Sequence, residues 1–108
     1  MSIYTPDCWA VLEFSSPTTE TIRKVFAGWY GGYAGSDSWK LSSGITKTTE
    51  YDNRFEFLNH SGSLYICHKN AQRMSSYMGM VLVHWLKQAS ERSPDNSFTI
   101  KDVSDEYV

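Results

Sequence analysis

Apolar residues crowd the chain between positions 8 and 14 in a run that predicts a β-strand. All but one of these residues are apolar, and the run is rich in β-branched and aromatic types. Because successive side chains of a strand point to opposite faces, the run divides into two sets. We expect the core face to be formed by Ala10, Leu12 and Phe14, with Trp9, Val11 and Glu13 on the other face.

The next apolar segment, residues 21–29, fits two patterns. Its large apolar residues recur at helical spacing: Ile22, Val25, Phe26, Trp29 and Tyr30. Its β-branched and aromatic content, and the glycine-rich stretch that follows, suit a strand instead. We favour the strand, because two helical turns that end in glycines would be marginal alone. The short Ser, Pro and Thr segment at 15–20 then closes a hairpin with the first strand.

Three more strands are predicted in the middle of the chain, followed by one helix. The strands cover residues 39–50, with a bend at 42–44, then 54–58 and 63–68. Compact turns at 51–53 and 59–62 separate them. The helix runs from Ser75, a plausible N-cap, to Ser90, and its broad apolar face suits packing across a sheet.

The predicted fold class is α+β: an antiparallel sheet of about five strands with one long C-terminal helix packed on one face. A short strand at 98–101 follows the helix, and residues 102–108 are expected to form a loose acidic tail. A length of 108 residues suits one domain, so we expect residues 1–108 to form a single domain.

The composition and net charge of the chain limit the cellular location and the classes of partner that we expect. A formal net charge of −2 gives no general attraction to phosphate, so we do not expect nucleic-acid binding. The two cysteines lie far apart, and the first residues have neither the basic start nor the apolar run of a signal peptide. No apolar stretch approaches the ~20 residues of a membrane span. We therefore expect a soluble, cytoplasmic protein with no membrane association.

Catalytic and metal signatures are weak. Cys67 and His68 are adjacent, but in a strand they point to opposite faces and cannot share one ion. His60 and His84 match no zinc spacing with them. Residues 61–63 resemble part of a nucleophile elbow but lead into a predicted strand. We therefore expect no catalytic residue, no metal and no cofactor, and favour a protein that is not an enzyme.

Aromatic residues around the glycine cluster form the candidate binding site. Trp and Tyr are enriched at the energetic centres of protein interfaces. Burial is favoured for Trp29, whereas burial and exposure are equally supported for Tyr30 and Tyr33. The candidate binding residues are Trp29, Tyr30, Tyr33, Trp39 and His68.

Three segments of the chain resemble small uncharacterised proteins encoded in tailed-bacteriophage genomes. They are residues 28–33 (GWYGGY), 37–45 (DSWKLSSGI) and 61–69 (SGSLYICHK), and the resemblance spans about residues 28–77. That group has no assigned reaction, so the resemblance implies origin and not activity. It implies a phage accessory protein that acts in the host cytoplasm by binding host or phage macromolecules.

The predicted function is therefore a non-enzymatic phage accessory protein that binds another protein, of host or phage, through an aromatic surface. A homodimer is a second way of burying that surface. The first alternative is a small hydrolase or metal-dependent enzyme centred on Cys67 and His68, with His60 and His84. The second is a platform for single-stranded nucleic acid, with bases stacked on rings beside Lys40, Lys47, Arg54 and Lys69.

Overall fold

A long hairpin whose inner half is buried on both faces organises the fold. The computed structural model describes residues 1–32, 35–93, 95 and 97–108. Its hairpin consists of β2 (Cys8–Ser16) and β3 (Thr19–Trp29), which confirms the strand interpretation of residues 21–29. Residues 8–12 and 25–28 are buried without alternation. The choice of a single core face was wrong, because Trp9 and Val11 are fully buried as well.

The described residues form two four-stranded sheets, whereas a single sheet of about five strands was expected. The hairpin belongs to one of these sheets. One sheet has the order β4-β3-β2-β8, with β4 at Ser38–Leu41 and β8 at Thr99–Asp102. The other has the order β1-β7-β6-β5, with β1 at Ile3–Tyr4, β5 at Ile45–Glu50, β6 at Arg54–Asn59 and β7 at Leu64–His68. All strand pairs are antiparallel except β1 with β7, so this second sheet is mixed.

The predicted bend at 42–44 is the point where the chain passes from one sheet to the other. The backbone N–H of Ser42 donates to the Val25 carbonyl, and the Ser42 hydroxyl accepts from the Val25 N–H at 2.8 Å. These two bonds hold the end of β4 against β3. The chain then turns away into β5, so the predicted single strand becomes two strands in different sheets.

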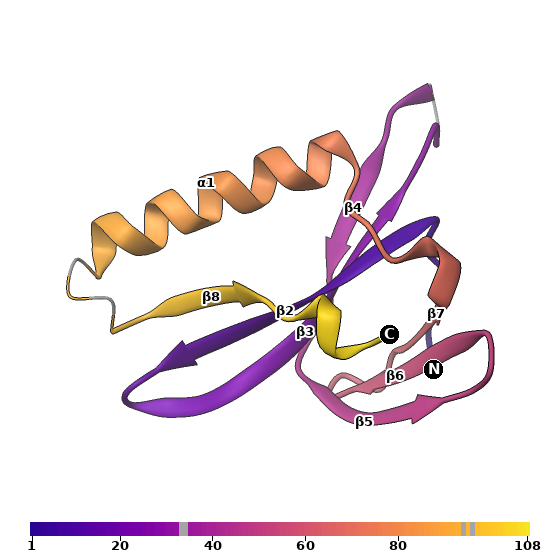
Figure 1. Cartoon of the computed structure of the whole chain (residues 1–108), viewed down its shortest axis with the longest axis horizontal. Helices are drawn as coiled ribbons and strands as arrows, with labels where there is room; N and C mark the ends of the chain where they lie inside the picture. The colour runs from indigo at the N-terminus through magenta and orange to yellow at the C-terminus, as the bar shows by residue number, and fades with distance from the viewer. Residues whose placement is uncertain (33–34, 94, 96) are drawn as a thin grey trace.

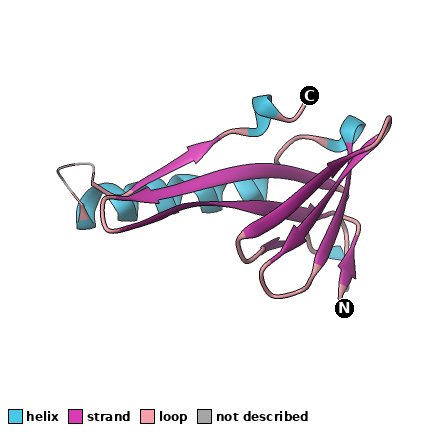
Figure 2. Cartoon of the chain, turned by 90° about the horizontal axis from the view of Figure 1, so that it is seen from below, coloured by secondary structure: helices cyan, strands magenta, loops and turns pink. Residues whose placement is uncertain are grey.

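One helix, α1 (Ser76–Arg92), lies along the hairpin in both views (Figure 1, Figure 2). Ser75 is its N-cap, as predicted, and its side chain accepts from the Met78 backbone N–H at 3.2 Å. The helix is not C-terminal, because β8 and a short 3₁₀ helix, η3 (Ser104–Glu106), follow it. A second 3₁₀ helix, η2 (Lys69–Ala71), leads from β7 towards α1. No helix in the described ranges is long and apolar enough to span a bilayer.

The molecule is thus built in three layers with two cores: α1, then the sheet containing β2 and β3, then the mixed sheet. Side chains from both sheets fill the inter-sheet core, among them Trp9, Val11, Val25, Phe55, Phe57, Tyr65 and Cys67. The core under α1 consists of Cys8, Ala10, Leu12, Phe26, Met78 and Leu82. The central hairpin contributes alternate residues to each core, and this explains its continuous apolar run.

The chain's last residues are packed, which corrects the expectation of a loose tail. Val103 is buried, and its backbone N–H donates to the Val11 carbonyl at 2.9 Å. The Tyr107 ring lies edge-on to Phe55 and Phe57, with centroids 5.7 and 5.4 Å away. The tail therefore closes one side of the inter-sheet core, and its acidic side chains remain outside.

Candidate functional site

The two tryptophans of the predicted aromatic site point to opposite faces of their sheet. β3 and β4 are in a register that pairs Gly28 with Trp39 and Trp29 with Ser38. Since neighbouring residues of a strand alternate, Trp29 and Trp39 belong to different layers. Trp39 packs under α1, where its ring centroid is 5.2 Å from that of Trp85. These side chains cannot form one binding surface.

Trp29 lies on the side of its sheet that faces the mixed sheet. Its ring lies edge-on to Tyr4 at a centroid distance of 6.3 Å, and its indole Nε1 donates to the Thr5 carbonyl at 3.2 Å. The side chain is half-buried, between the burial that was favoured and full exposure. Trp29 therefore anchors the N-terminal segment.

The remaining predicted binding residues are also dispersed. Tyr30 is exposed, and the Arg73 guanidinium lies 5.9 Å from its ring centroid and donates from Nε to its hydroxyl at 3.3 Å. His68 is half-buried at the end of β7, where its carbonyl accepts from Trp9 Nε1 at 2.7 Å. Tyr33 lies outside the described residues. Of the predicted set, Tyr30 is therefore the side chain that the structure leaves exposed.

The Cys67 thiol is poorly suited to catalysis. It is fully buried in the inter-sheet core, and this burial raises the pKa of the thiol far above its usual range. His68 follows it on the other face of β7, as strand alternation predicts. Within the part of the chain that the structure describes, no group of three or more His, Cys, Asp or Glu side chains is placed to hold a metal. The enzyme alternative thus has no assembled site in these residues.

Two of the four basic residues of the predicted nucleic-acid platform, Arg54 and Lys69, are paired with carboxylates, whereas Lys40 and Lys47 have no carboxylate partner among the described residues. Arg54 Nε lies 2.9 Å from a Glu56 carboxylate oxygen, and Lys69 Nζ lies 2.5 Å from one of Glu50. These pairs offset the positive charge that a nucleic-acid backbone requires. The geometry therefore gives little support to a platform for single-stranded nucleic acid.

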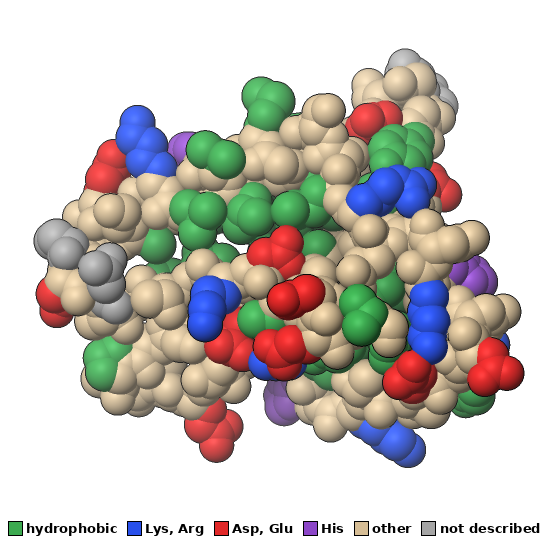
Figure 3. Space-filling model, viewed as in Figure 1, with side chains coloured by type: hydrophobic (Ala, Val, Ile, Leu, Met, Phe, Trp, Pro, Cys, Tyr) green, Lys and Arg blue, Asp and Glu red, His purple; other side chains and the backbone are tan. Residues whose placement is uncertain are grey.

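The outer side of α1 carries an apolar surface that sequence reasoning missed. Met80 and Val83 are 72% and 66% exposed, and at 100° per residue they point away from the buried Met78 and Leu82. Figure 3 shows hydrophobic side chains standing out along α1. We call this surface the outer helix face, which consists of Met80 and Val83 at its centre with Tyr77 and Leu86 at its flanks.

Charge is distributed unevenly around the outer helix face. Residues 76–86 contain no Lys, Arg, Asp or Glu. At 100° per residue, Lys87 and Glu91 lie on the same side of α1 as Met80 and Val83, whereas Arg92 lies on the sheet side and lines a hollow with Phe14 and Trp85. The apolar centre is therefore bordered at its C-terminal end by one basic and one acidic residue.

A signal for this surface was present in the sequence. Seven of the nine residues from Met78 to Leu86 are apolar, which is more than one buried stripe of a helix accommodates. The sequence interpretation gave the helix one broad apolar face and left Met80 and Val83 unassigned. Only one stripe of the helix packs on the sheet. The apolar side chains outside that stripe therefore remain in contact with solvent.

Comparison of the chain with protein-family models, with curated proteins and with solved structures gives no match. The tailed-phage origin remains a prediction from the resemblance alone. A functional conclusion therefore depends on the geometry of the described residues.

Ionisation of Tyr65 is expected to lower the free energy of unfolding at alkaline pH. The ring is buried against Tyr4, and burial, followed by the charges of Tyr4 and Cys67, raises the pKa of Tyr65 to about 12. The folded state therefore retains a proton that the unfolded chain loses near pH 10. The stability that this proton provides is present below pH 10 and is lost as the pH rises from 10 to about 12.

Urea unfolding at pH 9 and pH 11.5 tests this prediction, with Tyr65→Phe as the matched variant. The variant keeps the ring and removes the titrating hydroxyl, so its stability is expected to fall less over this range. An equal loss in both proteins would assign the alkaline response to other groups.

Proposed function

We propose that this protein is non-enzymatic and binds another protein through the outer helix face. The observation that carries the proposal is the exposure of Met80 and Val83 at the centre of an uncharged helical segment. Large exposed apolar patches with polar rims are typical of interaction sites. The proposed binding surface is thus the outer helix face and not the aromatic surface predicted from the sequence. Tyr30 and Arg73 lie near the beginning of this helix. A role as a phage accessory protein belongs to the same proposal and is supported by the sequence resemblance.

Covering the outer helix face with a protein partner would be favourable in free energy. Burying a Met or Val side chain contributes about 1.5–3 kcal/mol each. A partner that covers both residues would gain this amount without rearranging α1, whose inner side is already fixed by Met78 and Leu82. Exposed apolar anchors on a rigid helix resemble the preorganised centre of a protein interface.

The residues beside the apolar centre suggest the partner's chemistry. We propose a protein segment with an apolar centre that covers Met80 and Val83 and a carboxylate that lies near Lys87. A second copy of this chain is the competing occupant, and the test below distinguishes the two.

Val83→Asp is expected to weaken binding of the partner by at least about 100-fold, because it places a charge in the desolvated centre of the interface. Its effect on the free energy of unfolding is expected to stay below about 1 kcal/mol, as Val83 is exposed. Thr48→Asp, on an exposed position of β5, is the control that makes the same charge change in the other sheet.

The measurement begins with proteins retained from a host lysate by the wild type and by the control variant but not by Val83→Asp. Each is then purified and titrated calorimetrically against all three proteins. Sedimentation analysis of the isolated wild type shows whether copies pair. Equal binding by the three proteins, or a dimer that Val83→Asp dissociates, would contradict a heterologous partner on this face.

A further inference from the structure

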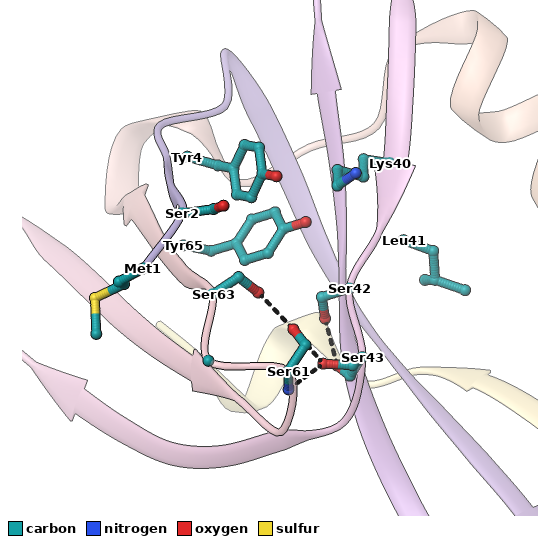
Figure 4. A pocket seen from close by; sticks show the side chains of 11 residues that line it. Met1, Ser2, Tyr4, Lys40, Leu41, Ser42, Ser43, Ser61, Ser63 and Tyr65 are labelled. Carbon is teal, nitrogen blue, oxygen red and sulfur yellow. Dashed lines mark hydrogen bonds between the residues drawn. The ribbon is translucent and has the colours of Figure 1, made fainter.

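A polar pocket lies at the edge where the two sheets meet, on a part of the surface that shares no residue with the outer helix face. Its volume is about 650 Å³, and its walls come from β1, β4, the start of β7 and the turns at 42–43 and 61–63. Figure 4 shows the side chains that surround it. This size falls in the range of small-molecule sites.

Two tyrosines and one lysine form the upper part of the pocket in Figure 4. The rings of Tyr4 and Tyr65 are stacked with centroids 4.9 Å apart, and both hydroxyls point towards the Lys40 side of the pocket. Lys40 Nζ lies 5.3 Å from the Tyr4 ring centroid. Among the described residues, neither tyrosine hydroxyl has a hydrogen-bond partner and Lys40 has no carboxylate within 4 Å. These groups are available to a ligand.

A chain of serine hydroxyls forms the opposite side. Ser43 Oγ donates to Ser61 Oγ at 3.0 Å and accepts from the Ser61 backbone N–H at 3.1 Å. Ser61 Oγ lies 3.1 Å from Ser63 Oγ. Either Ser61 or Ser63 can be the donor in this contact, because a hydroxyl that accepts from Ser43 keeps a second lone pair. When Ser61 donates to Ser63, the Ser63 proton is free to donate into the pocket. Such a chain polarises its last donor.

We propose that this pocket binds a small molecule through an oxyanion group, a phosphate or a carboxylate. Lys40 would supply the charge, and the hydroxyls of Tyr65 and Ser63 would donate to the oxyanion from the two sides. Among the described residues no Asp or Glu lines the pocket, so no carboxylate of this part of the chain opposes an anion there. The volume exceeds that of a bare oxyanion, and the remainder of the ligand would lie against the Tyr4 ring.

The raised pKa of Tyr65 agrees with this role, because the hydroxyl stays protonated and able to donate throughout the neutral range. Binding here is also independent of a protein partner on α1. A failure of one proposal therefore leaves the other unaffected.

Chemical-shift titrations with inorganic phosphate, acetate and glucose test the proposal. We expect phosphate or acetate to shift the amide signals of residues 40–43 and 61–65 saturably, and glucose to leave them unchanged. The anion that binds more tightly identifies the source of the oxyanion. Absence of saturable shifts at these residues up to about 50 mM of either anion, or equal binding of glucose, would overturn the proposal.

Three variants locate the interaction. Lys40→Gln is expected to weaken anion binding at least about tenfold, because it removes the positive charge, and Ser63→Ala about threefold, because it removes one donor. Lys47→Gln is the matched control, since this exposed lysine on β5 does not line the pocket. Amide spectra of all three establish that they are folded. Equal weakening by Lys40→Gln and Lys47→Gln would show general charge attraction and overturn the assigned site.

Discussion

Replacing Trp9 by alanine is expected to lower the free energy of unfolding by about 3–5 kcal/mol. The Trp9 ring is fully buried between the sheets, with centroids 6.0 Å from Phe55 and 5.7 Å from Phe57. Its indole Nε1 also donates to the His68 carbonyl at 2.7 Å, which joins β2 of one sheet to the end of β7 in the other. The substitution thus removes both the packing and a hydrogen bond between the layers.

Urea unfolding followed by far-UV circular dichroism measures this loss. Trp9→Phe is the informative companion, because it keeps an aromatic ring in the core but removes the indole donor. We expect its cost to be smaller, about 1–3 kcal/mol, mostly from the unsatisfied His68 carbonyl. A cost below about 1 kcal/mol for Trp9→Ala would show that the two sheets are not held together through this ring.

Gly28→Ala is expected to destabilise the protein by about 1–3 kcal/mol, although it adds a single methyl group. Gly28 is buried in β3 beneath α1 and opposite Cys8 of β2. A β-carbon at this position would overlap Met78 Sδ and lie 2.9 Å from Cys8 Sγ. Either α1 must move away from the sheet or the Met78 side chain must leave its position, and both disturb the core under the helix.

Gly79→Ala provides the matched control for this prediction. Gly79 lies in α1, and a β-carbon there has no neighbour within 4 Å. The same change is therefore expected to stabilise the protein by up to about 1 kcal/mol through helix propensity. Thermal unfolding of both variants should give shifts of opposite sign. Shifts of the same sign and size would contradict a close approach between α1 and β3 at Gly28.

Local features of the fold could be predicted where residue type alone decides the backbone. The glycines and polar residues of the turns, the β-branched content of residues 21–29 and the Ser75 cap all act over a few residues. Most strands and α1 were placed near their observed positions for this reason, whereas β1 was not predicted and the strand expected at 39–50 is two strands. The tail at 102–108 was misjudged because its acidic residues suggested solvation, whereas Val103 and Tyr107 pack against distant elements.

The candidate site was less predictable. Trp29, Trp39 and His68 are close in the sequence to other aromatic or basic residues, and this proximity suggested one surface. Their strand positions separate them into different layers, and pairing partners far along the chain determine that separation. Met80 and Val83 were not assigned to any face, since nothing in a helical sequence marks which stripe meets the sheet.

By itself, the sequence determined the kind and order of the elements: strands, turns and one capped helix in an α+β chain. Only the tertiary structure decided that residues 42–44 divide the strands between two sheets, that β2 and β3 are buried on both faces, and that part of α1 remains exposed. The physical reason is the range of the interactions. Propensities and caps act within a few residues, whereas burial depends on which distant element covers a face, as the position of Met78 against Gly28 shows.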